Sequence, residues 1–415
     1  MLSDHHRATV SATVPALRAH GQEITRVFYR DMLGAHPELF DYFNPANQRS
    51  GGQAASLAAS VLAYATHIAD PAPLAGMIER ISSKHASLEI RPEHYPIVGK
   101  YLLGAIAKVL GTAATPAILD AWTAAYGQLA AIMVGQEARM ADQGAAQPGG
   151  WRGFKPFRVA RKVRESEVTA SFTLEPIDGA ALPPFLPGQY LSIRVKVPGF
   201  GHVQMRQYSL SAAPNGRDYR IGVKREAAPP ATPSAMPGLV SNHLHDAVHE
   251  GDSLDVHMPL GDFVVRPGAG PVVLLSGGSG ITAVLGMLEH LASPGETREV
   301  VFLHAATHRG HHAFGSHVRA LARQRPGIRV AVWYEKAGPE DEAGVHHDLV
   351  GRLTARTLRT AVPTACADYY YCGPLGFMAG VEGALDELGV LPARRFSEAF
   401  APDPSFGLTL EEAHP

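Results

Sequence analysis

Cysteine is nearly absent from this sequence, which has only Cys366 and Cys372 among its 415 residues. Two thiols cannot form the disulfide framework of a small secreted protein, and they cannot supply a four-thiolate zinc or iron–sulfur site. Any redox chemistry in this chain would therefore have to come from a bound flavin, haem or nicotinamide.

The sequence also has no excess of positive or negative charge, and its first residues do not form an apolar run. Its formal net charge is -2 and its pI is near 6.9, so we expect no nucleic-acid partner. The segment from Met1 to Arg7 does not look like a signal peptide, and we expect no stretch long and apolar enough to span a bilayer. We therefore expect a cytoplasmic protein, and we expect it to be a monomer.

What is present indicates a multidomain globular protein. The apolar fraction is 46% and the charged fraction 18%, as in packed proteins, and the length favours two or three domains. Residues 1–140 are Ala-rich and interrupted by prolines, which predicts an all-α domain. After a predicted linker at 141–150, residues 151–267 show short alternating segments typical of an antiparallel β-barrel. Residues 268–415 alternate strand and helix, which predicts an α/β domain with a parallel sheet.

The segment from Met205 to Ser211 carries the strongest chemical pattern. Arg206 offers a cation for a phosphate, Tyr208 an aromatic ring for an isoalloxazine, and Ser209 a hydroxyl for flavin N5 or O4. An ordinary strand with alternating side chains is the alternative interpretation of these residues.

Neighbouring motifs resemble the FAD-binding domain of the ferredoxin reductase family. They are Pro187-Gly188-Gln189-Tyr190 upstream and Gly238-Leu239-Val240-Ser241 downstream. The resemblance implies FAD as a cofactor. The residues expected to bind it are Tyr190, Arg206, Gln207, Tyr208, Ser209, Gly238, Val240 and Ser241. The helix predicted after Gly238 would present backbone N–H groups to the FAD pyrophosphate.

A second phosphate-binding pattern follows the apolar strand Val272 to Leu275. The residues are Gly277, Gly278, Ser279, Gly280, Ile281 and Thr282, followed by a helix predicted from Val284. Glycines allow the backbone to approach a pyrophosphate, so this crossover predicts binding of NAD(P)H. Arg309 could bind the 2′-phosphate of NADPH, or it could be a solvated loop charge, so the choice between NADH and NADPH stays open.

Two later segments also resemble ferredoxin reductases. Cys372, Gly373 and Pro374 resemble the family's nicotinamide-side motif. The segment Glu398, Ala399, Phe400, Ala401 and Pro402 resembles its terminal strand, where the aromatic residue covers the flavin and the acid tunes it. Ala283, Ala399 and Ala401 depart from the usual residues of the family.

In the first domain, apolar residues recur at helical spacing and lead to His85. Leu74, Met77, Ile78 and Ile81 lie on one face, and His85 is the next position on it. From spacing alone, His85 could be a core histidine or a metal ligand.

The surroundings of His85 resemble the proximal segment of a globin, and further positions narrow the resemblance to flavohaemoglobins. The resemblance implies haem b with His85 as its iron ligand, and Phe43 and Lys84 beside it. It also implies Tyr29 and Gln53 as the distal pair, with Tyr95 and Glu137 behind the proximal histidine. From spacing alone, Glu137 could equally be a solvated charge at a helix end, and Lys84 a surface lysine.

Three modules in this order resemble flavohaemoglobins along nearly the whole chain. The resemblance implies a nitric oxide dioxygenase that takes electrons from NAD(P)H through FAD to haem, with NO and O2 as substrates and nitrate as product. Alternatives with the same cofactors are reduction of hydroperoxides or oxygen, a haem-based gas sensor, and a reductase that serves a separate oxygenase.

Overall fold

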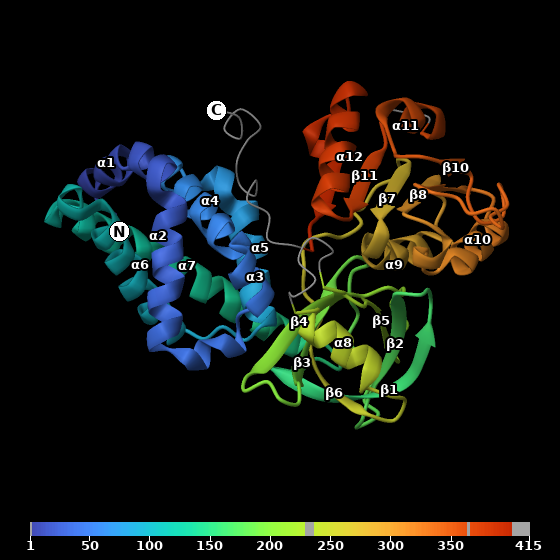
Figure 1. Cartoon of the computed structure of the whole chain (residues 1–415), viewed down its shortest axis with the longest axis horizontal. Helices are drawn as coiled ribbons and strands as arrows, with labels where there is room; N and C mark the ends of the chain where they lie inside the picture. The colour runs from blue at the N-terminus through green and yellow to red at the C-terminus, as the bar shows by residue number, and fades with distance from the viewer. Residues whose placement is uncertain (1, 229–235, 363–365, 401–415) are drawn as a thin grey trace. The chain divides into compact units, whose positions relative to one another are not determined.

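The computed structural model describes residues 2–228, 236–362 and 366–400 (Figure 1). The chain divides into two compact units. The first contains Met1–Ala146 and Pro198–Met205, and the second contains Gln147–Val197 and Arg206–Phe400.

The first unit is helical. Its α-helices are α1 (Asp4–Ala12), α2 (Val14–Ala35), α3 (Pro45–Ser50), α4 (Gly52–Thr66), α5 (Ala75–Ser87), α6 (His94–Leu110) and α7 (Pro116–Ala146). Helix α2 packs against α4 and α6, while α7 packs against α1, α5 and α6. Phe28, Met32, Ile106 and Trp122 belong to the apolar core between them. The all-α prediction for this part is confirmed.

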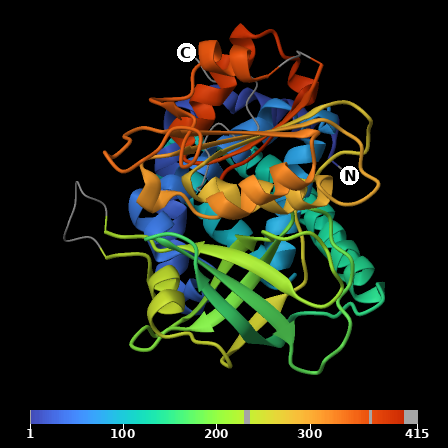
Figure 2. The ribbon, with the colours of Figure 1, turned by 90° about the vertical axis from the view of Figure 1, so that its right-hand side faces the viewer.

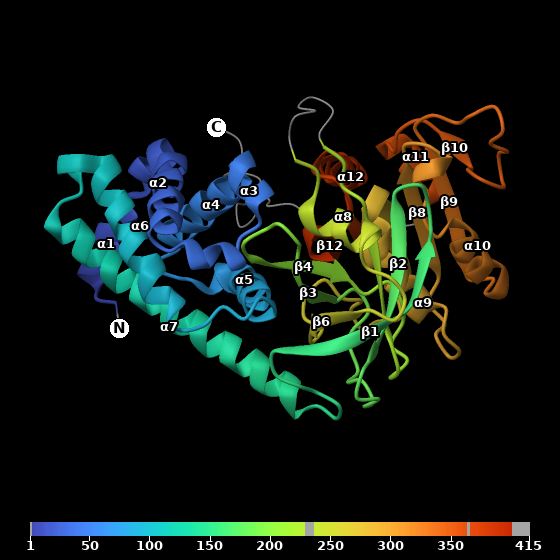
Figure 3. The ribbon, with the colours of Figure 1, turned by 60° about the horizontal axis from the view of Figure 1, so that its bottom comes forward.

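Helix α7 is longer than the sequence suggested, and Figure 3 shows it as one extended rod. It runs for 31 residues to Ala146, so the part of the predicted linker from 141 to 146 is helical. Gly144 stands in its last turn, where a glycine costs only about 1 kcal/mol relative to alanine. The domain bounds at 140, 151 and 268 stay predictions.

Two helices contradict the expectation that no stretch is long and apolar enough to cross a bilayer. The segments His94–Ala113 and Pro116–Ala146 have windows of mean hydropathy 1.2 and 1.3 and meet that test by length and composition. Both segments belong to the helical unit just described, and their buried residues join its core. Helices that pack against one another in a soluble core pass the same test, so it is weak evidence for a membrane span.

The second unit begins with an antiparallel sheet of six strands. They are β1 (Phe154–Arg164), β2 (Thr169–Pro176), β3 (Tyr190–Lys196), β4 (Val203–Ser209), β5 (Tyr219–Lys224) and β6 (Ser253–His257). The strand order is β4-β3-β6-β1-β2-β5, and a bridge between Leu210 and Ile221 joins its two edges. This closure confirms the predicted barrel. Helix α8 (Leu239–Asp246) covers the segment that the sequence marked as helical.

The rest of this unit is a parallel sheet with helices on both faces, as Figure 2 shows. Its strands are β7 (Val272–Gly277), β8 (Val300–Ala306), β9 (Ile328–Tyr334), β10 (Leu349–Val350), β11 (Asp368–Cys372) and β12 (Arg395–Glu398). Its helices are α9 (Ile281–Leu291), α10 (Gly315–Gln324), α11 (Ala355–Ala361) and α12 (Leu375–Glu387). Side chains of β7 alternate between the two faces: Leu274 packs with α9 and Leu275 with α12. The parallel α/β prediction is confirmed.

The order of this sheet is β10-β9-β8-β7-β11-β12. The chain moves outward from β7 to β8 on one side and later returns to β11 on the other. Such a reversal opens a crevice at the carboxyl ends of the two central strands, where α/β sheets bind ligands. The Gly-rich loop after β7 and the turn after β11 both lie there.

One contact set ties the barrel to the parallel sheet. Glu289 on α9 accepts hydrogen bonds from Arg220 on β5 at 2.6 Å and from the Ala213 amide at 2.9 Å. The ring of His317 on α10 lies 2.7 Å from the same carboxylate. Burial by itself would raise the pKa of Glu289, but these partners lower it overall. Barrel and sheet are therefore joined by a charged contact that three separate segments share.

Histidines are not confined to the surface in this unit. His304 on β8 is 1% exposed, and its ring stacks on His312 at 4.9 Å. Burial, followed by the charge of Arg319, lowers the pKa of His312 to about 4. Burial and then the charge of His312 lower the pKa of His304 well below its usual value. Both rings are therefore neutral at pH 7, and protonating them opposes folding.

The parallel sheet should therefore lose stability in mild acid. A folded-state pKa below the unfolded value means that the unfolded chain binds more protons, so stability falls as pH drops from about 6.5 to about 4. At pH 5 the loss should be about 2 kcal/mol for His312. Urea unfolding followed by the fluorescence of Trp333, in a chain with Trp122 and Trp151 replaced by phenylalanine, measures it.

His312→Asn should remove the part of this pH dependence that comes from His312, while His249→Ala, at an exposed histidine of the barrel, should leave it intact. If the free energy of unfolding changed equally between pH 7 and pH 5 in wild type and both variants, the role given to His312 would be contradicted.

Candidate functional site

His85 lies near the end of α5 and its side chain is 34% exposed. Its Nδ1 atom lies 3.0 Å from Glu137 Oε1 and 3.1 Å from the Tyr95 hydroxyl. Tyr95 also donates a hydrogen bond to the Glu137 carboxylate. Within the described part of the chain, no hydrogen bond engages Nε2 of His85, so that nitrogen keeps a lone pair available to a metal.

Glu137 is 6% exposed although it sits in the middle of a long helix. It is therefore not the solvated helix-end charge that spacing alone allowed. Burial, and then the hydrogen bond and charge of Glu137, raise the pKa of Tyr95 well above its usual value. The phenol consequently stays protonated and acts as a donor to the carboxylate.

A second group of predicted residues comes together around Tyr29 on α2. Tyr29 is 8% exposed, forms a side-chain hydrogen bond with Gln53, and packs edge-to-face against Phe43 with 5.6 Å between ring centroids. Burial raises the pKa of Tyr29 far above its usual value, and the bond to Gln53 opposes this only in part. Tyr29 therefore keeps its proton at any physiological pH.

Tyr29 also borders an open pocket of about 720 Å³. Its lining mixes the apolar side chains Leu33, Phe40 and Ala54 with the arginines Arg26, Arg30 and Arg49. His85 is not among its lining residues. Lys84 is half-buried, and its carbonyl accepts a hydrogen bond from Ser87; no described contact engages its ammonium group.

These residues fit a haem. An imidazole held by a carboxylate at one ring nitrogen is the kind of ligand that haem iron takes from proteins. The hydroxyl of Tyr29 and the amide of Gln53 supply polar groups, and Phe43 an apolar one. Tyr29 and Glu137, which are more than 100 residues apart in the sequence, thus belong to one helical unit.

The predicted flavin residues lie on the barrel. Tyr190 begins β3 and is buried, Ser209 at the end of β4 is buried, and Arg206, Gln207 and Tyr208 are half-buried on β4. Burial lowers the pKa of Arg206 and raises that of Tyr208 well above its usual value. A half-buried guanidinium beside a protonated phenol suits an anionic ligand that carries an aromatic ring.

Gly238, Val240 and Ser241 form the start of α8. Gly238 is the N-cap, and Ser241 Oγ accepts a hydrogen bond from the Glu226 amide at 3.2 Å. Val240 is buried and anchors the helix on the barrel. A helix start of this kind, with its unpaired N–H groups, favours a phosphate. Both observations on the barrel fit FAD.

The Gly-rich loop after β7 packs against the turn after β11. A Cβ atom on Gly280 would lie 1.9 Å from the carbonyl oxygen of Cys372, and one on Gly373 would lie 2.6 Å from the ring of Phe377. Thr282 Oγ1 donates to the Ser279 carbonyl at 2.9 Å. Helix α9 begins at Ile281 and not at Val284, so Ile281 and Thr282 lie in its first turn. This backbone cradle fits a dinucleotide phosphate.

The last predicted residues follow β11 and β12. Cys372 is fully buried, and burial, followed by the charge of Glu398, raises the pKa of its thiol well above the usual value. Cys372 and Glu398 are register partners in the two parallel strands, while Pro374 caps α12. Ala399 is half-buried and Phe400 is 49% exposed. Ala401 and Pro402 lie outside the described residues.

Comparison with family models agrees with this layout. The globin model matches residues 26–133, the oxidoreductase FAD-binding domain model residues 156–265, and the oxidoreductase NAD-binding domain model residues 274–383.

Similar proteins cover the full length. A flavohemoprotein of Deinococcus radiodurans is 57% identical over 406 residues, which are 98% of each chain. This chain belongs to the flavohaemoprotein family. The structure of a flavohemoglobin from Malassezia yamatoensis with bound FAD and heme aligns with a TM-score of 0.82 at 30% identity, covering 96% of this chain and 99% of that one.

A partial match is also informative. The FAD/NAD-binding domain of a nitric oxide dioxygenase from Vibrio cholerae aligns with a TM-score of 0.53 at 38% identity, covering 60% of this chain and 99% of that domain. The flavohaemoprotein described here is thus an oxidoreductase with haem, FAD and NAD-binding domains in one chain.

Sequence reasoning missed the residues that join barrel to sheet. Glu289, Arg220 and His317 are far apart in the chain and belong to no motif, so only their meeting in space reveals them. Phe377 was also missed, although its ring closes over Gly277 and Gly373. Its position four residues after the second glycine offered a weak signal.

Gly280→Ala should disrupt the dinucleotide cradle. Because the new methyl group would meet backbone and not a movable side chain, we expect a loss of about 3 kcal/mol in the stability of the parallel sheet and little NADH-dependent flavin reduction. Thermal melting and reduction of ferricyanide by NADH measure the two effects. Gly376→Ala is the matched control, since a Cβ there meets nothing within 4 Å; equal behaviour of the two variants would contradict the close approach.

Proposed function

We propose that this flavohaemoprotein is a nitric oxide dioxygenase that converts NO and O2 to nitrate with electrons from NAD(P)H. The overall reaction balances when two NO, two O2 and one NAD(P)H give two nitrate ions, NAD(P)⁺ and a proton. The observation that carries the proposal is the pairing of a carboxylate-backed His85 with a buried, protonated Tyr29 in the same helical unit.

The similar proteins support this proposal. The Vibrio cholerae protein whose reductase part is 38% identical is a nitric oxide dioxygenase by name. The globin model match supports a gas as substrate. In this proposal the protein acts as a monomer in the cytoplasm, where NAD(P)H is produced.

The proximal residues would set the electron donation of His85. Haem, when bound, supplies an iron atom that binds a diatomic gas, and FAD converts hydride reduction into single-electron steps. Glu137 accepts from Nδ1 of His85, which keeps the proton on that nitrogen and the lone pair on Nε2. The carboxylate gives the ring imidazolate character and makes it a stronger donor. Tyr95 holds the carboxylate in place through its own hydrogen bond.

Tyr29 would present its O–H to the reacting gas, and Gln53 would orient that hydroxyl. Because burial keeps Tyr29 protonated, it can donate a hydrogen bond to developing negative charge on oxygen, which is worth more in a dry site than in water. Phe43, packed against Tyr29, would keep water away, and Lys84 is proposed to lie beside the haem.

The reductase residues would position the electron source. Arg206 is proposed to pair with an FAD phosphate, Tyr208 and Tyr190 to pack on its rings, and Ser209 to bond the flavin. Gln207 and the start of α8, with Gly238, Val240 and Ser241, would complete the FAD site.

The NAD(P)H phosphates would lie on the cradle of Gly277, Gly278, Ser279, Gly280, Ile281 and Thr282. Cys372, Gly373 and Pro374 would shape the nicotinamide side, while Glu398, Ala399 and Phe400 would border the flavin. The buried thiol of Cys372 takes no nucleophilic part.

Electrode measurement of NO loss, in air-saturated buffer with haem- and FAD-loaded protein, tests the proposal. Tyr29→Phe should reduce NO turnover by about 100-fold, because it removes one donor to developing charge, while NADH-dependent reduction of ferricyanide stays unchanged. Tyr64→Phe is the matched control, since Tyr64 is also buried and its hydroxyl donates to the Ala125 carbonyl at 3.1 Å.

Fast NO loss that needs both NADH and O2 would support a dioxygenase. Consumption of NADH while NO persists would refute NO as the substrate and would favour reduction of hydroperoxides or oxygen. Equal NO turnover in wild type and Tyr29→Phe would refute the role proposed for Tyr29 but not the dioxygenase reaction itself.

Glu137→Gln should lower the iron–histidine stretching frequency of the ferrous protein without loss of haem, because a neutral amide leaves His85 with less imidazolate character. Resonance Raman spectroscopy measures this frequency. Asp120→Asn, at an exposed acid on the same helix, should leave it unchanged, and an unshifted frequency in Glu137→Gln would contradict the positioning role.

A further inference from the structure

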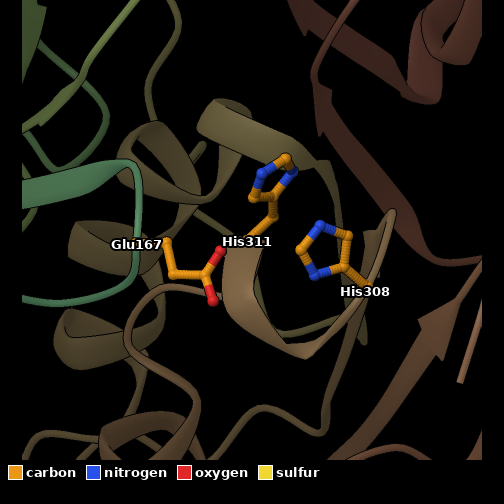
Figure 4. A group of neighbouring side chains, drawn as sticks. All are labelled: Glu167, His308 and His311. Carbon is orange, nitrogen blue, oxygen red and sulfur yellow. The ribbon is translucent and has the colours of Figure 1, made fainter. Parts of the chain in front are cut away.

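Glu167, His308 and His311 form a cluster that takes no part in the sites above. Each residue offers one ligand atom, and these atoms all lie within 4.8 Å of one another. Glu167 lies in the turn between β1 and β2 of the barrel. His308 is the N-cap of the 3-10 helix η5 (Arg309–His311) after β8, and His311 is the last residue of that helix. Figure 4 shows the three side chains gathered around one space.

We propose that these three residues bind one divalent transition-metal ion of the zinc type. Two imidazoles and one carboxylate suit zinc, whereas magnesium and calcium prefer oxygen ligands alone. Three protein ligands with water in the fourth position complete a tetrahedral shell. The ion would link the barrel to the parallel sheet within the second unit.

The backbone holds the ligands close together without the metal. The Glu167 amide donates to the Gly310 carbonyl at 2.8 Å, which ties the barrel turn to η5. Gly310 also has no side chain to obstruct the site: a Cβ there would lie 2.4 Å from the Glu167 carboxylate. The Glu167 carboxylate can therefore lie close to the backbone of η5 and near both histidines.

Both histidines are oriented by neighbouring groups. Nδ1 of His311 lies 2.7 Å from the Thr307 hydroxyl, which leaves Nε2 for a metal. The Gly310 amide donates to Nδ1 of His308 at 3.1 Å, so a metal ion at that nitrogen would have to displace the amide. A hydrogen bond at the ring nitrogen that does not bind the metal, as at Nδ1 of His311, orients histidine ligands in known metal sites.

The ring of His308 also caps η5, whereas the Glu167 carboxylate has no such second use among the described contacts. Among the described residues, no hydrogen bond or ion pair engages the Glu167 carboxylate, although it is exposed and the histidines lie near it. The histidine rings approach with 4.1 Å between centroids. In a tetrahedral site, ligand atoms lie about 3.4 Å apart, so binding needs small inward rotations of three partly exposed side chains.

Zinc binding to the haem- and FAD-loaded protein tests the proposal. Competition with a chromophoric chelator gives the dissociation constant, and equilibrium dialysis followed by metal analysis gives the stoichiometry. Wild type should bind one zinc ion per chain more than the double variant His308→Ala/His311→Ala. The single variants and Glu167→Gln should each weaken this binding by at least about tenfold.

His249→Ala controls for nonspecific binding to exposed histidines. It should bind zinc like the wild type, and zinc should raise the melting temperature of both proteins but not that of the double variant. Equal stoichiometry and affinity in the double variant, the His249 control and the wild type would overturn the proposal. The ferricyanide assay verifies that each variant is folded, and the test does not depend on the reaction at the haem.

Discussion

The helical unit depends on the need to satisfy one buried carboxylate. Glu137 is 6% exposed, and a charge in that position is strongly unfavourable unless it is hydrogen-bonded. Its partners His85 and Tyr95 come from two other helices, α5 and α6, so all three helices must pack in register with α7. Removing one partner of such a buried group typically costs about 3–5 kcal/mol. The same bonds that satisfy Glu137 engage Nδ1 of His85 and not Nε2, so packing and the proposed ligand chemistry rest on one contact.

A comparable contact organises the second unit, which holds the barrel and the parallel sheet. Glu289 joins a barrel strand, a barrel loop and two helices of the parallel sheet through Arg220, Ala213 and His317. Close by, a Cβ on Gly222 of β5 would lie 2.4 Å from the Thr282 methyl group, so the barrel touches the first turn of α9 directly. This packing brings the loop that suits a dinucleotide against the barrel that suits a flavin. The proximity of the two sites therefore follows from ordinary side-chain packing between β5 and α9.

Local patterns predicted most secondary structure, and the errors have physical causes. Strands β5 and β9 match their sequence segments, because alternating or continuous apolar residues between turns leave little choice. The linker was predicted too early because Gly144 looks like a helix end, although the preceding packed turns of α7 hold the helix to Ala146. The sequence analysis expected no apolar segment of bilayer length, whereas α6 and α7 pass that test by length and composition alone. Helix α9 begins early because tertiary packing buries Ile281 and Thr282.

The sequence by itself determined the three domain types and their order, because helical spacing, alternating strands and a strand–loop–helix crossover each leave a local pattern. Its family resemblance also predicted residues for haem, FAD and NAD(P)H. Only the tertiary structure decided which of them meet. It buried Glu137 against His85, paired Tyr29 with Gln53, and brought Glu167 to His308 and His311. These contacts join segments separated by up to about 140 positions, and no local propensity encodes them. Side-chain chemistry can be inferred from a pattern, but burial and distance follow only from packing.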